Sequence, residues 1–214
     1  MKSSEKRGGL GLEYTQLGNT GIDVSRICLG AMGFGDPDKW VHQWVLKEED
    51  SRPIIQKALD LGINFFDTAN VYCEGNSEII LGKAMRGRRN AFLVASKAGL
   101  QKRDDAFGLS RKALLDELDG SLRRLQTDYI DIYYLHAPDY QPPVEETLAT
   151  LDTMVRSGKV RYIGTSNHAA WQICRLHHLA AGTGLVRPTV TQAVYNLVTR
   201  GIEGELVPFL REYG

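Results

Sequence analysis

Cysteine is scarce in this chain, and long hydrophobic runs are absent. The 214 residues include only Cys28, Cys73 and Cys174, which are far apart and form no C-x-x-C pair. An odd number of widely spaced thiols argues against disulfides or a cysteine-bound metal and favours free thiols in a reducing cytosol. No apolar run approaches the ~18 residues of a membrane-spanning helix, and no apolar signal segment follows the first residues. We therefore expect a cytoplasmic protein without a membrane partner.

The chain also lacks an excess of charge of either sign. Lys+Arg and Asp+Glu both number 26, so the formal net charge is zero. This balance gives no broad electrostatic attraction to nucleic acid or to an anionic membrane, and neither is expected as a partner. The hydrophobic content of 43% over 214 residues is enough for a substantial core in one domain.

Two common nucleotide-binding motifs are missing as well. Neither G-x-G-x-x-G nor G-x-x-x-x-G-K-[ST] occurs, and Gly33 and Gly35 have no third glycine at the required spacing. Neither a Rossmann site nor a P-loop is therefore indicated.

What the chain does contain is a repeated strand–helix unit. Residues 1–13 are charged and Gly-rich and are expected to be a disordered leader, with one domain over 14–214. Residues 14–26 predict a β-hairpin that turns at Gly18-Asn19-Thr20-Gly21. Six strands are then predicted at 27–30, 63–67, 91–97, 129–136, 160–166 and 188–192. Helices are predicted after them, around 54–61, 77–86 with Ser77 as N-cap, 110–125, 144–156, 171–179 and 203–213.

Strict alternation of strands and helices favours a parallel sheet with helical crossovers. An open doubly wound sheet and a (β/α)₈ TIM barrel both fit this order. Asp67, Lys97 and His136 end three successive strands. In each strand the ionisable residue is in phase with the residues expected to face inward, which are Ile63 and Phe65, Leu93 and Ala95, and Ile132 and Tyr134. Ionisable residues at the C-terminal ends of several strands are typical of a barrel active site, whereas a doubly wound sheet concentrates its site at one switch point. The sequence therefore predicts a barrel.

These strand ends also suggest a reaction. Tyr72 follows Asp67 by five residues, in a loop, and its phenol holds a proton at neutral pH. An ammonium such as Lys97 stabilises a phenolate, Asp67 holds the ammonium, and a neutral His136 can hydrogen-bond a substrate oxygen. Such an assembly suits proton delivery to an oxygen that becomes an alkoxide. The alternative is a structural ion pair beside a loop aromatic, which four such residues at strand ends make less attractive.

The sequence resembles the aldo-keto reductase family, in the branch of bacterial and plant reductases and potassium-channel β subunits. Four residues match the family's tetrad: Asp67, Tyr72, Lys97 and His136. Further matching motifs are Phe66-Asp67-Thr68-Ala69, Gly75-Asn76-Ser77-Glu78, Leu135-His136, Gly158 to Asn167 and Gln192-Ala193-Val194-Tyr195-Asn196.

The resemblance implies a (β/α)₈ barrel that uses NADPH/NADP to reduce an aldehyde or ketone, with Tyr72 as the acid. It also implies that Ser166, Asn167 and Gln192 bind the nicotinamide carboxamide. Gly30, Ala31 and Met32 would line the cofactor, although Ala31 and Met32 replace the Thr and Trp of some relatives. The expected partner is a small carbonyl substrate, and a homo-oligomer is possible.

The sequence departs from the family in length. Only about six of the eight βα units are present, so we expect a barrel that is incomplete at its C-terminus and lacks the segment that holds the adenosine phosphates. Two alternatives to an active reductase stay open: an NADPH-binding module similar to potassium-channel β subunits, and an inactive fragment. His136 favours the enzyme, because the channel subunits typically carry Asn at this position.

Overall fold

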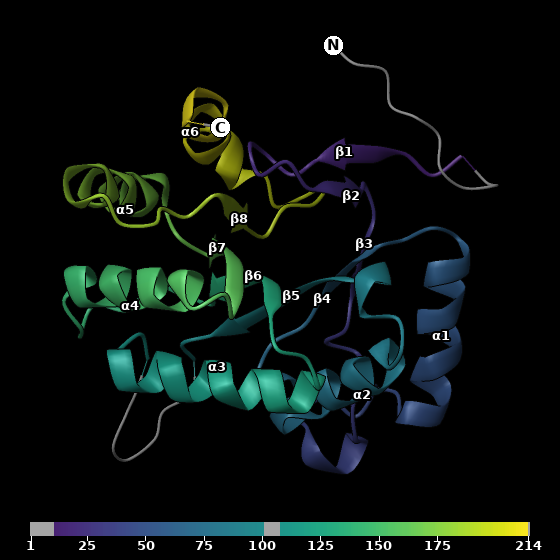
Figure 1. Cartoon of the computed structure of the whole chain (residues 1–214). Coiled ribbons are helices and arrows are strands. Elements are labelled where there is room, and N and C mark those ends of the chain that lie inside the picture. The colour runs from purple at the N-terminus through teal and green to yellow at the C-terminus, as the bar shows by residue number, and fades with distance from the viewer. Residues whose placement is uncertain (1–10, 101–107, 214) are drawn as a thin grey trace.

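The computed structural model describes residues 11–100 and 108–213 (Figure 1). Most of the expected leader, residues 1–10, lies outside the described residues. The chain then forms the predicted hairpin, in which β1 (Tyr14–Gln16) pairs antiparallel with β2 (Asp23–Ser25).

The main sheet has six parallel strands that are adjacent in chain order. Neighbouring strand ends are in register, with Gly30 opposite Asp67, Asp67 opposite Ala95, and Ser166 opposite Gln192. The strands are β3 (Cys28–Gly30), β4 (Phe65–Asp67), β5 (Leu93–Ala98), β6 (Ile130–Leu135), β7 (Val160–Ser166) and β8 (Val190–Gln192). Parallel neighbours in simple order are the arrangement of a barrel, not of a doubly wound sheet, whose order reverses.

Helices connect the strands and form an arc around the sheet (Figure 1). They are α1 (Glu48–Asp60), α2 (Asn76–Met85), α3 (Arg111–Leu125), α4 (Val144–Arg156), α5 (Ala170–Thr183) and α6 (Leu206–Tyr213). The fold is therefore six consecutive units of a (β/α)₈ barrel, as predicted. No helix in the described part of the chain is long and apolar enough to cross a bilayer.

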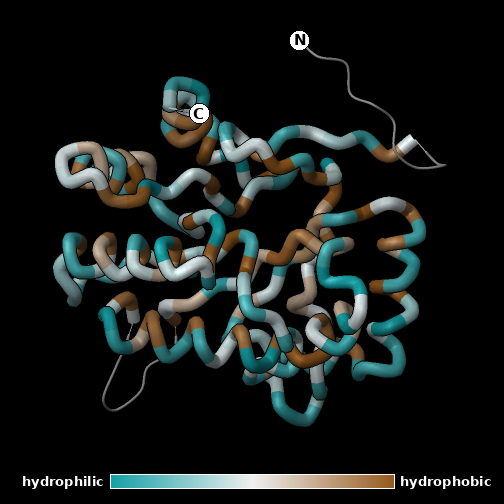
Figure 2. Tube along the Cα trace, viewed as in Figure 1, coloured by the Kyte–Doolittle hydropathy of each residue, from teal (hydrophilic) through white to brown (hydrophobic). Residues whose placement is uncertain are grey.

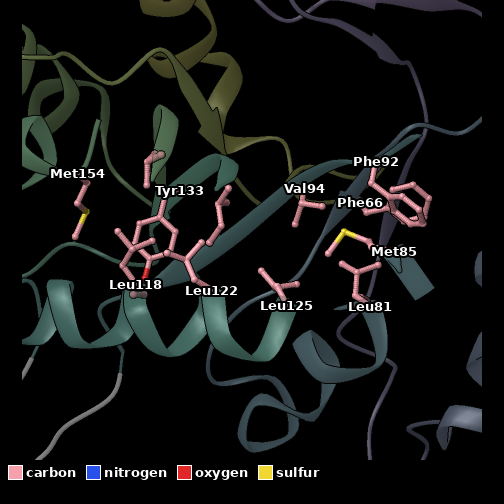
Figure 3. Close-up of a cluster of buried hydrophobic side chains, with 14 of the residues drawn as sticks. Phe66, Leu81, Met85, Phe92, Val94, Leu118, Leu122, Leu125, Tyr133 and Met154 are labelled. Carbon is pink, nitrogen blue, oxygen red and sulfur yellow. The ribbon is translucent and has the colours of Figure 1, made fainter. Parts of the chain in front are cut away.

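Alternate residues of each strand face two different cores. Phe66, Val94 and Tyr133 belong to the helix-facing core: Val94 and Tyr133 lie toward Leu125 and Leu118 of α3, and Phe66 lies beside Phe92 (Figure 3). In the hydropathy colouring, hydrophobic residues are frequent along the central strands and recur along the helices around them (Figure 2). This helix-facing core contains most of the buried hydrophobic residues, and the burial of apolar surface is the main favourable contribution to folding.

The opposite, inner face carries a smaller cluster, in which Phe65, Ala95, Ile132 and Tyr134 pack together. Leu17 from the hairpin packs against this cluster, so the hairpin covers part of the inner face. Since strand residues alternate between faces, Asp67 and Lys97 share the parity of Phe65 and Ala95. The predicted inward parity is thus confirmed for these strands.

Several details of the prediction were wrong, among them the start of the third strand, since β5 begins at Leu93 and not at residue 91. Ile63 lies before β4 and packs with the helix-facing core, so it does not share the inner face with Phe65. Ser77 is inside α2 and does not cap it; Gly75 is the N-cap, and the Ser77 hydroxyl donates to the Ala31 carbonyl at 2.7 Å. Helix α5 extends to Thr183, four residues beyond the predicted end, because Gly184 is the first residue to adopt a left-handed conformation.

Candidate active site

The four tetrad residues meet at the C-terminal edge of the sheet. The ammonium of Lys97, which is completely buried, forms an ion pair with Oδ1 of Asp67. The same Nζ atom lies 3.0 Å from the carbonyl oxygen of Thr68 and 3.2 Å from the phenolic oxygen of Tyr72. The ring of His136 packs edge-on against Tyr72, with 5.8 Å between the ring centroids.

Each residue is placed by a different element. Asp67 is the last residue of β4 and Lys97 lies near the end of β5, and the β4–β5 pairing sets Asp67 opposite Ala95, two residues before Lys97. His136 directly follows β6, where its backbone N–H continues the ladder to the Ala98 carbonyl at 2.8 Å. Tyr72 is outside the sheet and begins a short turn, Tyr72–Gly75, before α2.

Burial controls the charge of two of these groups. Desolvation raises the pKa of Asp67 above its usual value, while the ammonium of Lys97 and the amide of Gln192 oppose that rise. Desolvation and the nearby Lys97 lower the pKa of His136 to about 4, so its imidazole is neutral at pH 7. Among the described residues, Nδ1 of His136 is buried without a hydrogen-bond partner, so any contact with a ligand has to use Nε2.

The three residues assigned to the nicotinamide carboxamide lie beside the tetrad. Ser166 and Gln192 end the neighbouring strands β7 and β8. Asn167 follows β7 in a left-handed conformation (φ 59°), and its amide donates to the His136 carbonyl at 3.2 Å and to the Ser166 hydroxyl at 3.1 Å. Gln192 donates to Oδ2 of Asp67 at 3.2 Å. The structure therefore joins these residues directly to the tetrad.

The residues from the first strand differ in accessibility. Gly30 and Met32 are exposed, whereas Ala31 is completely buried in the helix-facing core. The N–H of Ala31 donates to the Asp67 carbonyl at 2.7 Å, and its carbonyl accepts the Ser77 hydroxyl. Ala31 is thus an anchor for this strand end, and Gly30 and Met32 are the members of the trio that a ligand can reach.

Several contacts around the site were not predicted from the sequence. The Thr68 carbonyl accepts a hydrogen bond from Lys97, and the Gln192 amide restrains Asp67. Behind β5, the buried carboxylate of Glu78 accepts the Ser96 hydroxyl and pairs with Arg124 at 2.6 Å. A fully buried carboxylate requires such partners, but the spacing of Glu78 and Arg124 in the sequence does not reveal them.

Several aromatic and thiol side chains away from the tetrad take structural or surface positions. Trp44 is exposed and stacks on His42, with ring centroids 5.1 Å apart. Within residues 11–100 and 108–213, no group of three or more His, Cys, Asp or Glu side chains is placed to hold a metal. All three cysteines are free thiols.

Comparison with known proteins identifies the family. A model described as "Aldo/keto reductase family" matches residues 26–214. The chain belongs to the aldo/keto reductase family. The tetrad lies at the C-terminal edge of the sheet, which is the edge at which barrel enzymes carry their active sites.

Individual aldo/keto reductase relatives include both enzymes and channel subunits. Versiconal hemiacetal acetate reductase of Aspergillus parasiticus is 37% identical over 95% of this chain, and the uncharacterized oxidoreductase YrpG of Bacillus subtilis is 40% identical over 95%. A probable voltage-gated potassium channel subunit beta of Oryza sativa is 39% identical, again over 95% of the chain. The matches cover 65%, 64% and 61% of these relatives, so the chain spans less than two thirds of their length.

Proposed function

We propose that this chain carries the proton-donating site of an NADPH-dependent reductase that converts an aldehyde or ketone to an alcohol. The observation that carries the proposal is the contact between Tyr72 and Lys97, whose Nζ lies 3.2 Å from the phenolic oxygen. A phenol beside a buried ammonium is suited to give up its proton, because the ammonium stabilises the negative charge that remains. A cytoplasmic location, in which the thiols stay reduced, belongs to the same proposal.

The side chains beside the tetrad fit a nicotinamide carboxamide. A carboxamide both donates and accepts hydrogen bonds, and Ser166, Asn167 and Gln192 offer a hydroxyl and two amides with the same capacity. All three lie at one edge of the inner face, linked by hydrogen bonds to Asp67 and His136. When bound, the dinucleotide supplies the hydride.

The protein's own residues then handle the proton. Tyr72 donates its proton to the carbonyl oxygen of the substrate as negative charge develops there. Lys97 stabilises the resulting phenolate, and Asp67 and the Thr68 carbonyl hold the ammonium in place. His136, neutral at pH 7, donates a hydrogen bond from Nε2 to the same oxygen and so orients the carbonyl.

The test is the variant Tyr72→Phe, which removes the proton and leaves the ring. It is made in a chain completed to eight βα units, because residues 1–214 span 65% or less of the relatives' length. We expect the rate of reduction of a generic aromatic aldehyde to fall about 10²–10⁴-fold with unchanged NADPH affinity. Tyr213→Phe, on α6, is the matched control and should retain full activity. A Tyr72→Phe rate within threefold of the parent would remove Tyr72 from the acid role.

A second candidate function is a cofactor-binding module of an ion channel. The 39% identity to a protein named as a potassium channel subunit beta favours it. Such a module would bind NADPH and co-purify with a membrane channel but would reduce a carbonyl slowly. Rapid turnover together with no channel partner in a pull-down would decide for the reductase.

A further inference from the structure

The backbone that follows Tyr72 adopts an unusual conformation. Cys73 (φ 48°, ψ 49°) and Glu74 (φ 53°, ψ 34°) are both left-handed, and Gly75 continues at φ 86°. Only two other non-glycine residues in the described chain have positive φ, namely Gln126 and Asn167. Left-handed backbone is unfavourable for residues with a Cβ, so two of them in succession require strong restraints nearby.

The Cys73 side chain supplies such a restraint. It is completely buried, and its Sγ accepts the backbone N–H of Asp36 at 3.0 Å and donates to the Asp36 carbonyl at 3.1 Å. Gly35 fits closely over it, since a Cβ at Gly35 would lie 2.4 Å from the Cys73 Cβ and Sγ atoms. The thiol thus fastens the turn after Tyr72 to a segment 37 residues earlier in the chain.

That segment is itself anchored to the residues just before α1 and to the helix-facing core. The Gly35 N–H donates to the Leu46 carbonyl at 2.8 Å, and Phe34 is buried in the helix-facing core. On the other side of the turn, Arg124 packs against Gly75, where a Cβ would lie 2.6 Å from its Cδ. Within the described part of the chain, the side-chain hydrogen bonds that connect Cys73 to this anchored loop are the two made by its thiol.

We infer that Cys73 is a positioning residue for Tyr72: its thiol holds the turn that sets the phenol against Lys97 and His136. The inference rests on the proposed function only for its kinetic consequence, because the placement of the Tyr72 ring is measurable without any reaction. The left-handed backbone alone does not account for the cysteine, since glycine adopts this conformation at lower cost. The buried thiol therefore contributes through its two hydrogen bonds.

Three substitutions separate the effect of the left-handed backbone from that of the thiol hydrogen bonds. Cys73→Gly relieves the backbone and removes the thiol, Cys73→Ala removes the thiol alone, and Cys73→Ser keeps a donor and acceptor. Cys174→Ala, a half-buried cysteine on α5, is the matched control. Thermal melting verifies that each variant folds, and the glycine variant is expected to fold even where alanine does not.

The first measurement is NMR of protein labelled with ¹³C at the tyrosine ring carbon that bears the hydroxyl. The chain has nine tyrosines, and Tyr72→Phe assigns the relevant signal. We expect the Tyr72 signal to move by more than its linewidth in the glycine and alanine variants and to return toward the parent position in the serine variant. An unmoved signal in Cys73→Gly would overturn the inference, as would equal displacement in all three, which would assign the effect to lost volume.

The second measurement is steady-state kinetics in the completed chain. A displaced acid weakens transition-state stabilisation, so kcat should fall about tenfold in the glycine and alanine variants, with KM for the carbonyl changed less than twofold. Unchanged kcat in a variant whose Tyr72 signal has moved would overturn the kinetic consequence. If Tyr72→Phe itself stays active, the proposed function fails while the NMR result still decides the structural claim.

Discussion

The amide of Gln192 donates a 3.2 Å hydrogen bond to Oδ2 of Asp67, although β5, β6 and β7 lie between their strands. Four steps of ~4.8 Å in a flat sheet would separate the two strands by about 19 Å, which these side chains cannot bridge. The contact therefore requires the sheet to curl around its inner face, as it does in a barrel. It also places the side-chain amide of Gln192, at the end of β8, against the carboxylate that pairs with Lys97.

The first prediction concerns the neutral imidazole at the site. His136→Asn removes the Nε2 donor that the proposed mechanism directs at the substrate oxygen. Because that hydrogen bond strengthens only as charge develops, we expect kcat to fall about 10²-fold while NADPH affinity is nearly unchanged. Steady-state kinetics and fluorescence titration with NADPH measure the two effects. His178→Asn, at an exposed position of α5, is the control; equal losses of turnover and cofactor affinity would show that His136 is structural.

The second prediction concerns the pH dependence of stability. His136 has a pKa of about 4 in the folded protein against 6.5 for an ordinary histidine. Between pH 4 and pH 6.5 the histidine is protonated in the unfolded chain but not in the folded protein. The stability that the neutral imidazole contributes is therefore complete above pH 6.5 and is lost as the pH falls toward 4. We expect this residue to account for about 1–2 kcal/mol of the stability lost between pH 7 and pH 5.

Urea unfolding at the two pH values tests this, with His136→Asn as the comparison. The variant should lose less stability than the parent on acidification. His168 and His177, whose pKa values burial also lowers, are present in both proteins and cancel in the difference. The raised pKa of Asp67 has the opposite effect, because acidification then stabilises the folded state, and this effect is present in both the parent and the variant. An identical loss in parent and variant would contradict the assigned shift of His136.

The third prediction concerns the buried ion pair behind β5. Glu78 is completely buried and pairs with Arg124. Arg124→Met leaves this carboxylate uncompensated and should cost about 3–5 kcal/mol of unfolding free energy. Glu78→Gln combined with Arg124→Met should cost clearly less than the sum of the single changes. Arg26→Met, which breaks the exposed pair with Glu13, should cost at most about 1 kcal/mol.

The sequence predicted the sheet and the tetrad because each depends on a local pattern. Alternating apolar runs fixed the strands, and Asp67, Lys97 and His136 stood out as ionisable residues at strand ends. The Gln192–Asp67 contact depends on how strongly the sheet curls, which no local pattern specifies. The Cys73 thiol bonds and the left-handed turn after Tyr72 depend on a loop 37 residues away. Such long-range contacts cannot be inferred from spacing.

The last prediction concerns residues 1–214 expressed alone. In the described structure β3 and β8 form the two edges of the six-stranded sheet. Their unpaired N–H and C=O groups can pair with other chains. Exposed apolar residues lie close to both edge strands in the chain: Ile27 directly before β3, and Leu197 and Val198 shortly after β8, the last two 90% and 92% exposed. Open edges flanked by apolar side chains favour self-association.

We therefore expect residues 1–214 to self-associate and to bind NADPH much more weakly than an eight-unit barrel. The proposed carboxamide contacts of Ser166, Asn167 and Gln192 would remain. The resemblance to the family, however, implies that the phosphates are held by the eighth barrel strand, whereas β8 is only the sixth strand of this sheet. Charge-assisted bonds to phosphate are among the strongest single contacts, so their loss should dominate the affinity. Size-exclusion chromatography and NADPH fluorescence titration test both expectations, with Leu197→Glu/Val198→Glu expected to reduce association. A monodisperse monomer that binds NADPH at low micromolar concentration would show that six units suffice.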